Sequence, residues 1–286
     1  MQADQFTAPV TFHGEGAVWH PGWGGLRVVD MFTGDLVDLD DAGRPTRTPT
    51  GSPIAAMVRP RRAGGWLVAT EREFTLWTAA GEKEWSSDIL TPDGVRLNEG
   101  GCAPDGSLIC GSMAYDQKEG AAAVMRLDPA RHVHPLFDGV TISNGLGFTA
   151  DGERMYYADT QTGRIDVFDV EDAQTAARPV NRRPFVTIPE EDGAPDGLWV
   201  DSEDGVWVAL YGGSAVHHYD ARGRKGEVVE LPVSKVTSCT FGGADLRTLF
   251  ITTSREGLPE GEEPDAGAVF RAEVGVSGQP VLPYAG

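Results

Sequence analysis

Four side chains with polar oxygen atoms, Glu15, Asn98, Asn144 and Asp196, stand at matching places in a recurring pattern. Each lies where a short strand begins and an apolar residue would be expected, and each strand leads into a turn and a second apolar strand. Two carboxylates brought together repel each other, and a divalent cation is the simplest compensation. Ligation by oxygen atoms alone favours a hard ion, Ca²⁺, Mg²⁺ or Mn²⁺, and Zn²⁺ is less natural. The alternative is that these side chains cap turns through backbone hydrogen bonds, as Asn and Asp often do.

The elements that must position these side chains are repeated hairpins, and residues 141–160 hold the clearest copy. Asn144 lies near the start of this copy, and we call its position the corner of the unit. The Asp151-Gly152 turn and the strand pattern of residues 155–158 follow. Six such units have corners near positions 15, 55, 98, 144, 196 and 237. Their spacing of about 40 to 50 residues is typical of propeller blades, and no window shows the apolar stripe of a helical repeat.

The sequence therefore predicts an all-β, six-bladed β-propeller in which four-stranded antiparallel blades surround a central channel, with residues 1–286 forming one domain. The first strand of each blade lines the channel of a propeller. Glu15, Asn98, Asn144 and Asp196 should then meet at one mouth of the channel. Residues 1–14 should enter the first blade or close the ring by pairing with the C-terminal strand.

Residues 93–100 are the densest polar stretch of the chain. Strand alternation places Arg96 and Asn98 on one face and Leu97 and Glu99 on the other. Arg96 and Asn98 could thus enter one pocket, and the alternative for Arg96 is an ion pair within the fold. The basic run at residues 59–62 is interpreted as a surface turn because Gly64 and Gly65 follow it directly.

Composition excludes several classes of protein. A net charge of -19 opposes binding to nucleic acid or to an anionic membrane, because clustered Lys and Arg supply the attraction to phosphate. The first ten residues lack a basic start and an apolar run, and no 18 apolar residues are consecutive, so we expect a cytoplasmic protein. Cys102, Cys110 and Cys239 form no C-x-x-C pair and are expected to be buried thiols. His132 and His134 share a strand face, but no third metal ligand lies near them in the sequence.

The chain resembles the family of senescence marker proteins, gluconolactonases and luciferin-regenerating enzymes, the regucalcin-like lactonases. The resemblance covers nearly the whole chain and rests on six motifs: GEGAVW (14–19), RLNEG (96–100), SNGL (143–146), PDGL (195–198), TSCTFGG (237–243) and GAVFR (267–271). It implies a six-bladed propeller that binds one divalent metal ion, with Ca²⁺ as the expected ion. The implied metal ligands are Glu15, Asn144 and Asp196.

The resemblance also implies hydrolysis of a sugar lactone, with Arg96 and Asn98 holding the oxygen atoms of the sugar. A third substrate contact, a Glu in animal members, falls on Asp116 here, and Tyr115 beside it would add bulk to the pocket. Glu99 also departs from members that carry Asp after the Asn. These departures leave the identity of the lactone open.

A metal ion can hold the charge that develops on a lactone carbonyl oxygen, and Asp196 is the candidate general base for water. No G-x-S-x-G motif supports a serine nucleophile. Two other interpretations stay open, a metal-binding regulator without turnover and a propeller that only scaffolds partners. The sequence does not decide the oligomeric state.

Overall fold

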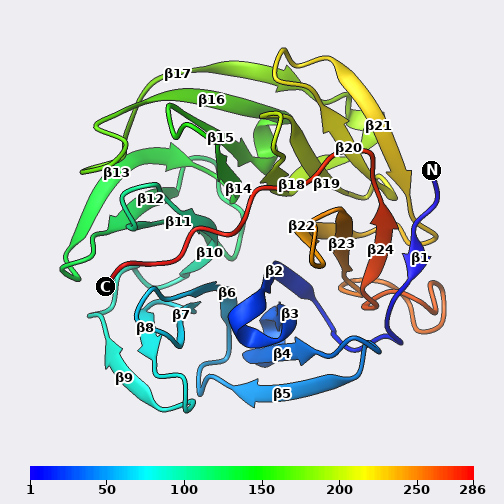
Figure 1. Cartoon of the computed structure of the whole chain (residues 1–286), viewed down its shortest axis with the longest axis horizontal. Coiled ribbons are helices and arrows are strands. Elements are labelled where there is room, and N and C mark those ends of the chain that lie inside the picture. The colour runs from blue at the N-terminus through cyan, green and yellow to red at the C-terminus, as the bar shows by residue number, and fades with distance from the viewer.

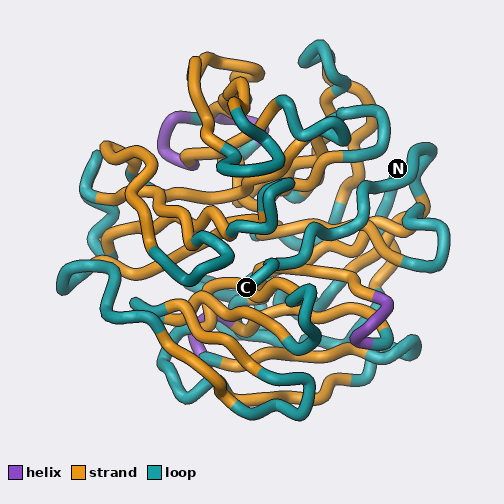
Figure 2. Tube along the Cα trace, turned by 60° about the vertical axis from the view of Figure 1, so that its left-hand side comes forward, coloured by secondary structure: helices purple, strands orange, loops and turns teal.

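The computed structural model describes residues 1–286 and contains six four-stranded antiparallel sheets arranged radially around a central axis (Figure 1). Strands make up most of the trace, and the helical segments are single short turns (Figure 2). The predicted six-bladed propeller is confirmed.

The blades are numbered here in chain order, and the strands of each are given from the axis outward. Blade 1 consists of β2 (Gly14–His20), β3 (Gly25–Asp30), β4 (Asp35–Leu39) and β5 (Pro45–Pro49). Blade 2 consists of β6 (Ala55–Pro60), β7 (Trp66–Thr70), β8 (Phe74–Trp77) and β9 (Lys83–Ser86). Blade 3 consists of β10 (Val95–Cys102), β11 (Leu108–Ala114), β12 (Ala122–Leu127) and β13 (Val133–Val140).

Blade 4 consists of β14 (Ser143–Phe148), β15 (Arg154–Asp159), β16 (Arg164–Glu171) and β17 (Arg178–Thr187). Blade 5 consists of β18 (Ala194–Val200), β19 (Val206–Tyr211), β20 (Ala215–Tyr219) and β21 (Lys225–Glu230). Blade 6 consists of β22 (Val236–Gly242), β23 (Thr248–Thr253), β24 (Phe270–Glu273) and β1 (Asp4–Gln5). Four 3-10 turns lie between strands: η1 (Pro21–Trp23), η2 (Met31–Thr33), η3 (Thr160–Thr162) and η4 (Glu190–Asp192).

The hairpin between β14 and β15 shows how the sequence makes these turns. Asp151 Oδ1 accepts hydrogen bonds from Thr149 Oγ1 at 2.7 Å and from the Glu153 amide at 2.9 Å. Gly152 has a φ of 75°, in the left-handed region that glycine enters without a steric penalty. The Asp-Gly pair therefore reverses the chain where the sequence predicted a turn.

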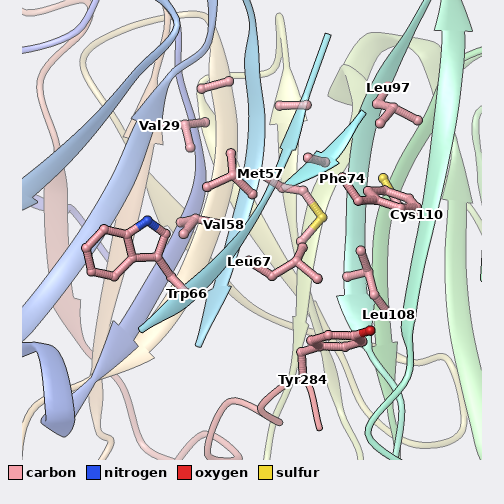
Figure 3. Close-up of a cluster of buried hydrophobic side chains, with 14 of the residues drawn as sticks. Val29, Met57, Val58, Trp66, Leu67, Phe74, Leu97, Leu108, Cys110 and Tyr284 are labelled. Carbon is pink, nitrogen blue, oxygen red and sulfur yellow. The ribbon is translucent and has the colours of Figure 1, made fainter. Parts of the chain in front are cut away.

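The hydrophobic core lies between neighbouring blades and along the channel wall. Its largest cluster joins blades 1, 2 and 3, and Figure 3 shows Val29, Met57, Phe74, Leu97 and Leu108 meeting there. These side chains are fully or almost fully buried, and each such burial stabilises the fold by about 1.5–3 kcal/mol. The packing fixes the innermost strands, which carry the corners.

Two terminal segments complete the ring. β1 pairs antiparallel with β24, which confirms that the N-terminal residues close the last blade. Residues 275–286 cross the other end of the channel, seen in red near the centre of Figure 1. Gln279 accepts a hydrogen bond from Trp199 Nε1 at 3.1 Å, and the buried Tyr284 joins the cluster of Figure 3. The small space left beneath this tail, about 50 Å³, is bounded by inner strands of blades 2 to 5.

The innermost strand of every blade contains a β-bulge at or beside its corner. The register with the next strand shifts between Leu97 and Gly100 in blade 3, between Ser143 and Leu146 in blade 4, and between Pro195 and Leu198 in blade 5. The other three blades have the same irregularity at the same end of the strand. A bulge redirects side chains out of the regular alternation, so it lets corner residues face the channel.

The interpretation of residues 59–62 as a surface turn is wrong for its first three members. β6 continues to Pro60, and Arg59 and Arg61 are both buried. Arg59 is paired with Glu99, and Arg61 Nη1 lies 2.8 Å from Glu84 Oε2. The following glycines suggested exposure, but the partners of these arginines lie far away in the sequence.

Candidate active site

A cavity of about 260 Å³ opens at the end of the channel where the innermost strands begin. Glu15 on β2, Arg96 and Asn98 on β10, Asn144 on β14 and Asp196 on β18 all line it. The structure thus brings together the four corner side chains and the arginine that the sequence singled out. Their positions depend on the bulges, which turn each of them toward the axis.

The two carboxylates are almost completely buried, with 4% of Glu15 and 5% of Asp196 exposed. Burial raises the pKa of Glu15 well above its ordinary value, and the charges of Asp196 and Glu99 raise it further. Burial also raises the pKa of Asp196, with a further contribution from Glu99. Two carboxylic acids buried in one cavity require either protons or a bound cation.

The acceptor atoms in the cavity fit a cation. Asn144 Oδ1 and Asp196 Oδ1 are buried and have no hydrogen-bond partner in the protein. The orientation of Asn144 is fixed because its Nδ2 donates to Thr160 Oγ1 at 3.0 Å, and Thr160 Oγ1 donates to the Pro195 carbonyl at 2.8 Å. Buried oxygen atoms without donors are costly, so a ligand that accepts their lone pairs is expected at this place. Hard divalent cations have that property.

No group of three His, Cys, Asp or Glu side chains in the chain is arranged to hold a metal ion. The expected ligand set has only two such residues, because its third member is the amide of Asn144.

Arg96 and Asn98 act on each other. Arg96 Nη1 donates to Asn98 Oδ1 at 2.6 Å, and Asn98 Nδ2 donates to the Ser143 carbonyl at 2.8 Å. No carboxylate lies within 4.0 Å of Arg96. Arg96 therefore does not form the ion pair within the fold that the sequence left as an alternative. Its guanidinium lies 5.7 Å above the ring of Phe32 and lines the cavity. A guanidinium held in this way can donate to oxygen atoms of a substrate.

Glu99 does not line the cavity with Arg96 and Asn98, which agrees with strand alternation, but it carries its charge close to the carboxylates there. Its Oε1 accepts from Arg59 Nη2 at 3.0 Å and from the Gly100 amide at 3.2 Å, and its charge acts on both Glu15 and Asp196. The register shift between Leu97 and Gly100 leaves Asn98 and Glu99 outside the regular pairing of β10 with β11. Its Oε2 is buried without a partner.

Tyr115 and Asp116 do not line the cavity. Half of Tyr115 is exposed, and its hydroxyl donates to Glu71 Oε1 at 2.6 Å. Asp116 is exposed and accepts from the Lys118 amide at 3.1 Å. The next residue, Gln117, does line the cavity, and its φ of 54° is unusual for a residue with a side chain. The loop is therefore at the rim, but a different side chain of the loop enters.

Several residues of the cavity were not identified from the sequence, among them His13, Phe32, Tyr211 and Glu256. His13 is two positions before the corner residue Glu15, and the same period-2 alternation could have pointed to it. Burial lowers the pKa of His13 to about 3, with Arg96 and Lys235 contributing to the same effect. Glu256 follows β23 and has no local signal of function.

The remaining groups considered from sequence have structural partners. The three cysteines are free and buried, and burial raises the pKa of Cys102 to about 12. His132 and His134 lie 3.4 and 2.9 Å from the same carboxylate, Asp128.

None of the helical segments has the length and apolar character that a membrane-spanning helix needs.

Residues 13–255 match the model of a protein family described as the SMP-30/gluconolactonase/LRE-like region. The chain belongs to this family. This membership confirms the resemblance that was inferred from the six sequence motifs. The matched range contains the cavity residues Glu15, Arg96, Asn98, Asn144 and Asp196.

Relatives within the SMP-30/gluconolactonase/LRE-like family align along nearly the whole chain. Regucalcin of Sus scrofa is 33% identical over 288 residues, which cover 96% of this chain and 95% of the relative. A pentonolactonase of Haloferax volcanii is 35% identical over 274 residues, covering 93% of this chain and 92% of the relative. These relatives are whole-chain counterparts, not shared fragments.

Solved structures agree with this assignment. A regucalcin from Agrobacterium tumefaciens, described as a calcium-binding protein, has a TM-score of 0.89 at 26% identity and covers 99% of this chain and 97% of its own. A gluconolactonase from Xanthomonas campestris has a TM-score of 0.74 at 20% identity, covering 93% and 87%. The second likeness supports the fold alone.

Proposed function

We propose that this protein hydrolyses a sugar lactone to the aldonic acid with the help of one divalent metal ion. The observation that carries the proposal is the placement of two buried carboxylates and two unpartnered acceptor oxygens in one cavity of a lactonase-family propeller. The name of one relative, a pentonolactonase that is 35% identical to this chain, supports the reaction class.

Glu15, Asn144 and Asp196 would hold the ion, and Ca²⁺ is the expected ion because all three ligands are oxygen atoms. The description of the Agrobacterium relative as calcium-binding agrees with this choice. Mg²⁺, Mn²⁺ and Zn²⁺ remain alternatives. When bound, a divalent ion supplies Lewis acidity, which draws electron density from the lactone carbonyl.

The residues of the chain supply the other parts of the reaction. Asp196 accepts the proton of the attacking water at its free Oδ1, the new bond forms between the water oxygen and the carbonyl carbon, and the ring C–O bond breaks. The ring oxygen leaves as a hydroxyl of the open acid after it takes up the proton that Asp196 accepted from the water. Arg96 donates to oxygen atoms of the sugar, and Asn98 contacts the sugar and holds Arg96 in place. Tyr115 and Asp116, which are exposed at the rim, would contact a part of the substrate that extends past the cavity.

A panel of pentono- and hexonolactones, assayed with a pH indicator with and without chelator, tests the reaction. We expect acid release that chelator abolishes and that added Ca²⁺ restores. If no lactone is opened under any metal condition, the proposed reaction is wrong.

Metal content tests the ligands separately from turnover. Glu15→Gln, Asn144→Ala and Asp196→Asn should each lower bound metal in elemental analysis, since each removes an oxygen ligand that its neighbours cannot replace. The fold should persist, because these side chains add little apolar burial. Full metal content in all three variants would remove the proposed site.

A second candidate is a calcium-binding regulator without turnover, which the name regucalcin of several relatives favours. It predicts tight metal binding by the wild type together with no acid release from any lactone of the panel.

A further inference from the structure

His13 occupies a fixed position at the junction of blades 1 and 6. Its backbone amide donates to Asp30 Oδ1 at 3.1 Å, its carbonyl accepts from the Met31 amide at 2.9 Å, and it forms an isolated bridge with Ser254. The His13 side chain is only 9% exposed, packs on Phe32 with ring centroids 4.6 Å apart, and lines the cavity. Such a ring has little freedom to reorient.

The hydrogen bonds of Ser254 select one tautomer of this ring. Ser254 is fully buried, and its Oγ accepts the Glu256 amide at 3.0 Å and lies 2.8 Å from His13 Nδ1. The hydroxyl proton of Ser254 has no acceptor other than Nδ1. If Nδ1 carried the proton instead, a buried hydroxyl would be left without an acceptor, which is unfavourable. The arrangement therefore places the ring proton on Nε2.

Glu256 competes for Nδ1 but is in a weaker position. Its Oε2 lies 3.4 Å from Nδ1, which is long for a hydrogen bond. The Glu256 side chain is 44% exposed, so water can solvate its carboxylate. The Ser254 hydroxyl is buried and has no such access to water.

Nε2 has no hydrogen-bond partner in the protein. Glu15 Oε1 is 3.9 Å away, beyond hydrogen-bond distance, although Glu15 lines the same cavity. An Nε2–H group so placed is an unpartnered donor beside the residues of the proposed reaction.

We propose that His13 is a further catalytic residue of the lactonase reaction, whose Nε2–H donates a hydrogen bond to an oxygen of the lactone ester group. This inference rests on the proposed lactone hydrolysis. The oxygens of the ester gain negative charge as water attacks, so the hydrogen bond strengthens in the transition state and lowers its free energy. His13 transfers no proton, and the bonds that form and break are those of the hydrolysis described above.

Kinetics on the metal-loaded protein test the contact. His13→Ala should lower kcat by roughly tenfold to a hundredfold, the range for loss of one hydrogen bond to a charge, while KM and bound metal stay near their wild-type values. His13→Gln, whose side-chain amide can present an N–H at a similar reach, should recover part of the loss. His132→Ala, in the turn directly before the outer strand β13, is the matched control and should leave kcat unchanged.

The tautomer can be measured without turnover. Nitrogen NMR of histidine-labelled, metal-loaded protein should show His13 protonated at Nε2. In Ser254→Ala the remaining partner of Nδ1 is Glu256, so the proton should move to Nδ1 and kcat should fall toward that of His13→Ala. This coupled change of tautomer and rate is not expected of a residue that only fills space.

An Nδ1–H tautomer in the wild type, or a kcat of His13→Ala within twofold of wild type with metal content intact, would overturn the role of His13. Both results leave the lactonase proposal standing. If the wild type itself opens no lactone, the proposed function fails instead.

Discussion

Asp196→Asn should change the stability of the protein in opposite directions with and without metal. In chelator, the wild type must bury two carboxyl groups whose pKa values are raised, chiefly by burial. The Asn side chain has nearly the same shape and carries no charge. We therefore expect the variant to be more stable than the wild type in chelator, and to gain less stability when Ca²⁺ is added.

The size of the effect follows from proton linkage. The pKa of Asp196 is raised from an ordinary value of 3.8, so the folded protein binds more protons than the unfolded chain as pH rises above that value. The stability that the protonated group contributes is complete below about pH 4 and is lost up to the raised folded pKa, at about 1.4 kcal/mol per pH unit. At pH 7 the wild type has lost an amount of stability through this one group. Asp196→Asn should recover part of that amount.

Thermal and urea unfolding between pH 5 and 8 measure both effects. A shift of roughly 2 °C or more is expected for each kcal/mol in a protein of this size. Asp201→Asn is a matched control in the same blade, because Asp201 is equally buried. Burial acts to raise the pKa of Asp201, but hydrogen bonds from His218, the Gly205 amide and Trp207 leave it below its ordinary value. Asp201→Asn should therefore destabilise the protein.

The reasoning is refuted if Asp196→Asn is no more stable than wild type in chelator and retains the wild-type dependence of stability on pH. Equal stabilisation of the variant and the wild type by Ca²⁺ would separately refute Asp196 as a ligand.

Three further outcomes follow from the same geometry. Arg59→Met should cost about 3–5 kcal/mol of unfolding free energy, measured with urea, because it leaves the Glu99 carboxylate buried without its cation. Glu99→Gln should cost less, since Arg59 keeps its bonds to two backbone carbonyls. Arg96→Ala should raise KM without changing metal content; unfolding of the variant would show that Arg96 has a structural role. Gln117→Ala should change the ratio of kcat/KM for two lactones of different ring size more than Asp116→Glu does, and the reverse order would place Asp116 rather than Gln117 against the substrate.

The fold and the corner side chains could be predicted from the sequence because both depend on local repetition. Asp-Gly turns such as Asp151-Gly152 and the spacing of the corners indicate blades, and blade geometry then brings Glu15, Asn144 and Asp196 together. Residues far apart in sequence become neighbours through symmetry, which requires no knowledge of side-chain packing.

The environment of Glu99 could not be predicted in the same way. Strand alternation predicts which face of β10 Glu99 lies on, but not which side chains it meets there. Its partner Arg59 comes from another blade, forty-one residues before the Gly100 carbonyl that it also binds. Gln117 and Glu256 enter the cavity from loops whose course depends on packing between blades. Bulges and loops are determined by tertiary contacts, which a single sequence does not display.

The tail that crosses the far end of the channel determines how molecules move through the site. Hydrogen bonds from Arg62 and Ala285 tie it to blades 2 and 3, and the buried Tyr284 anchors it. The cavity is therefore a dead end rather than a passage. A lactone and the acid formed from it must use the same mouth, one after the other. Acid that accumulates should then occupy the site and act as a competitive inhibitor of its own formation.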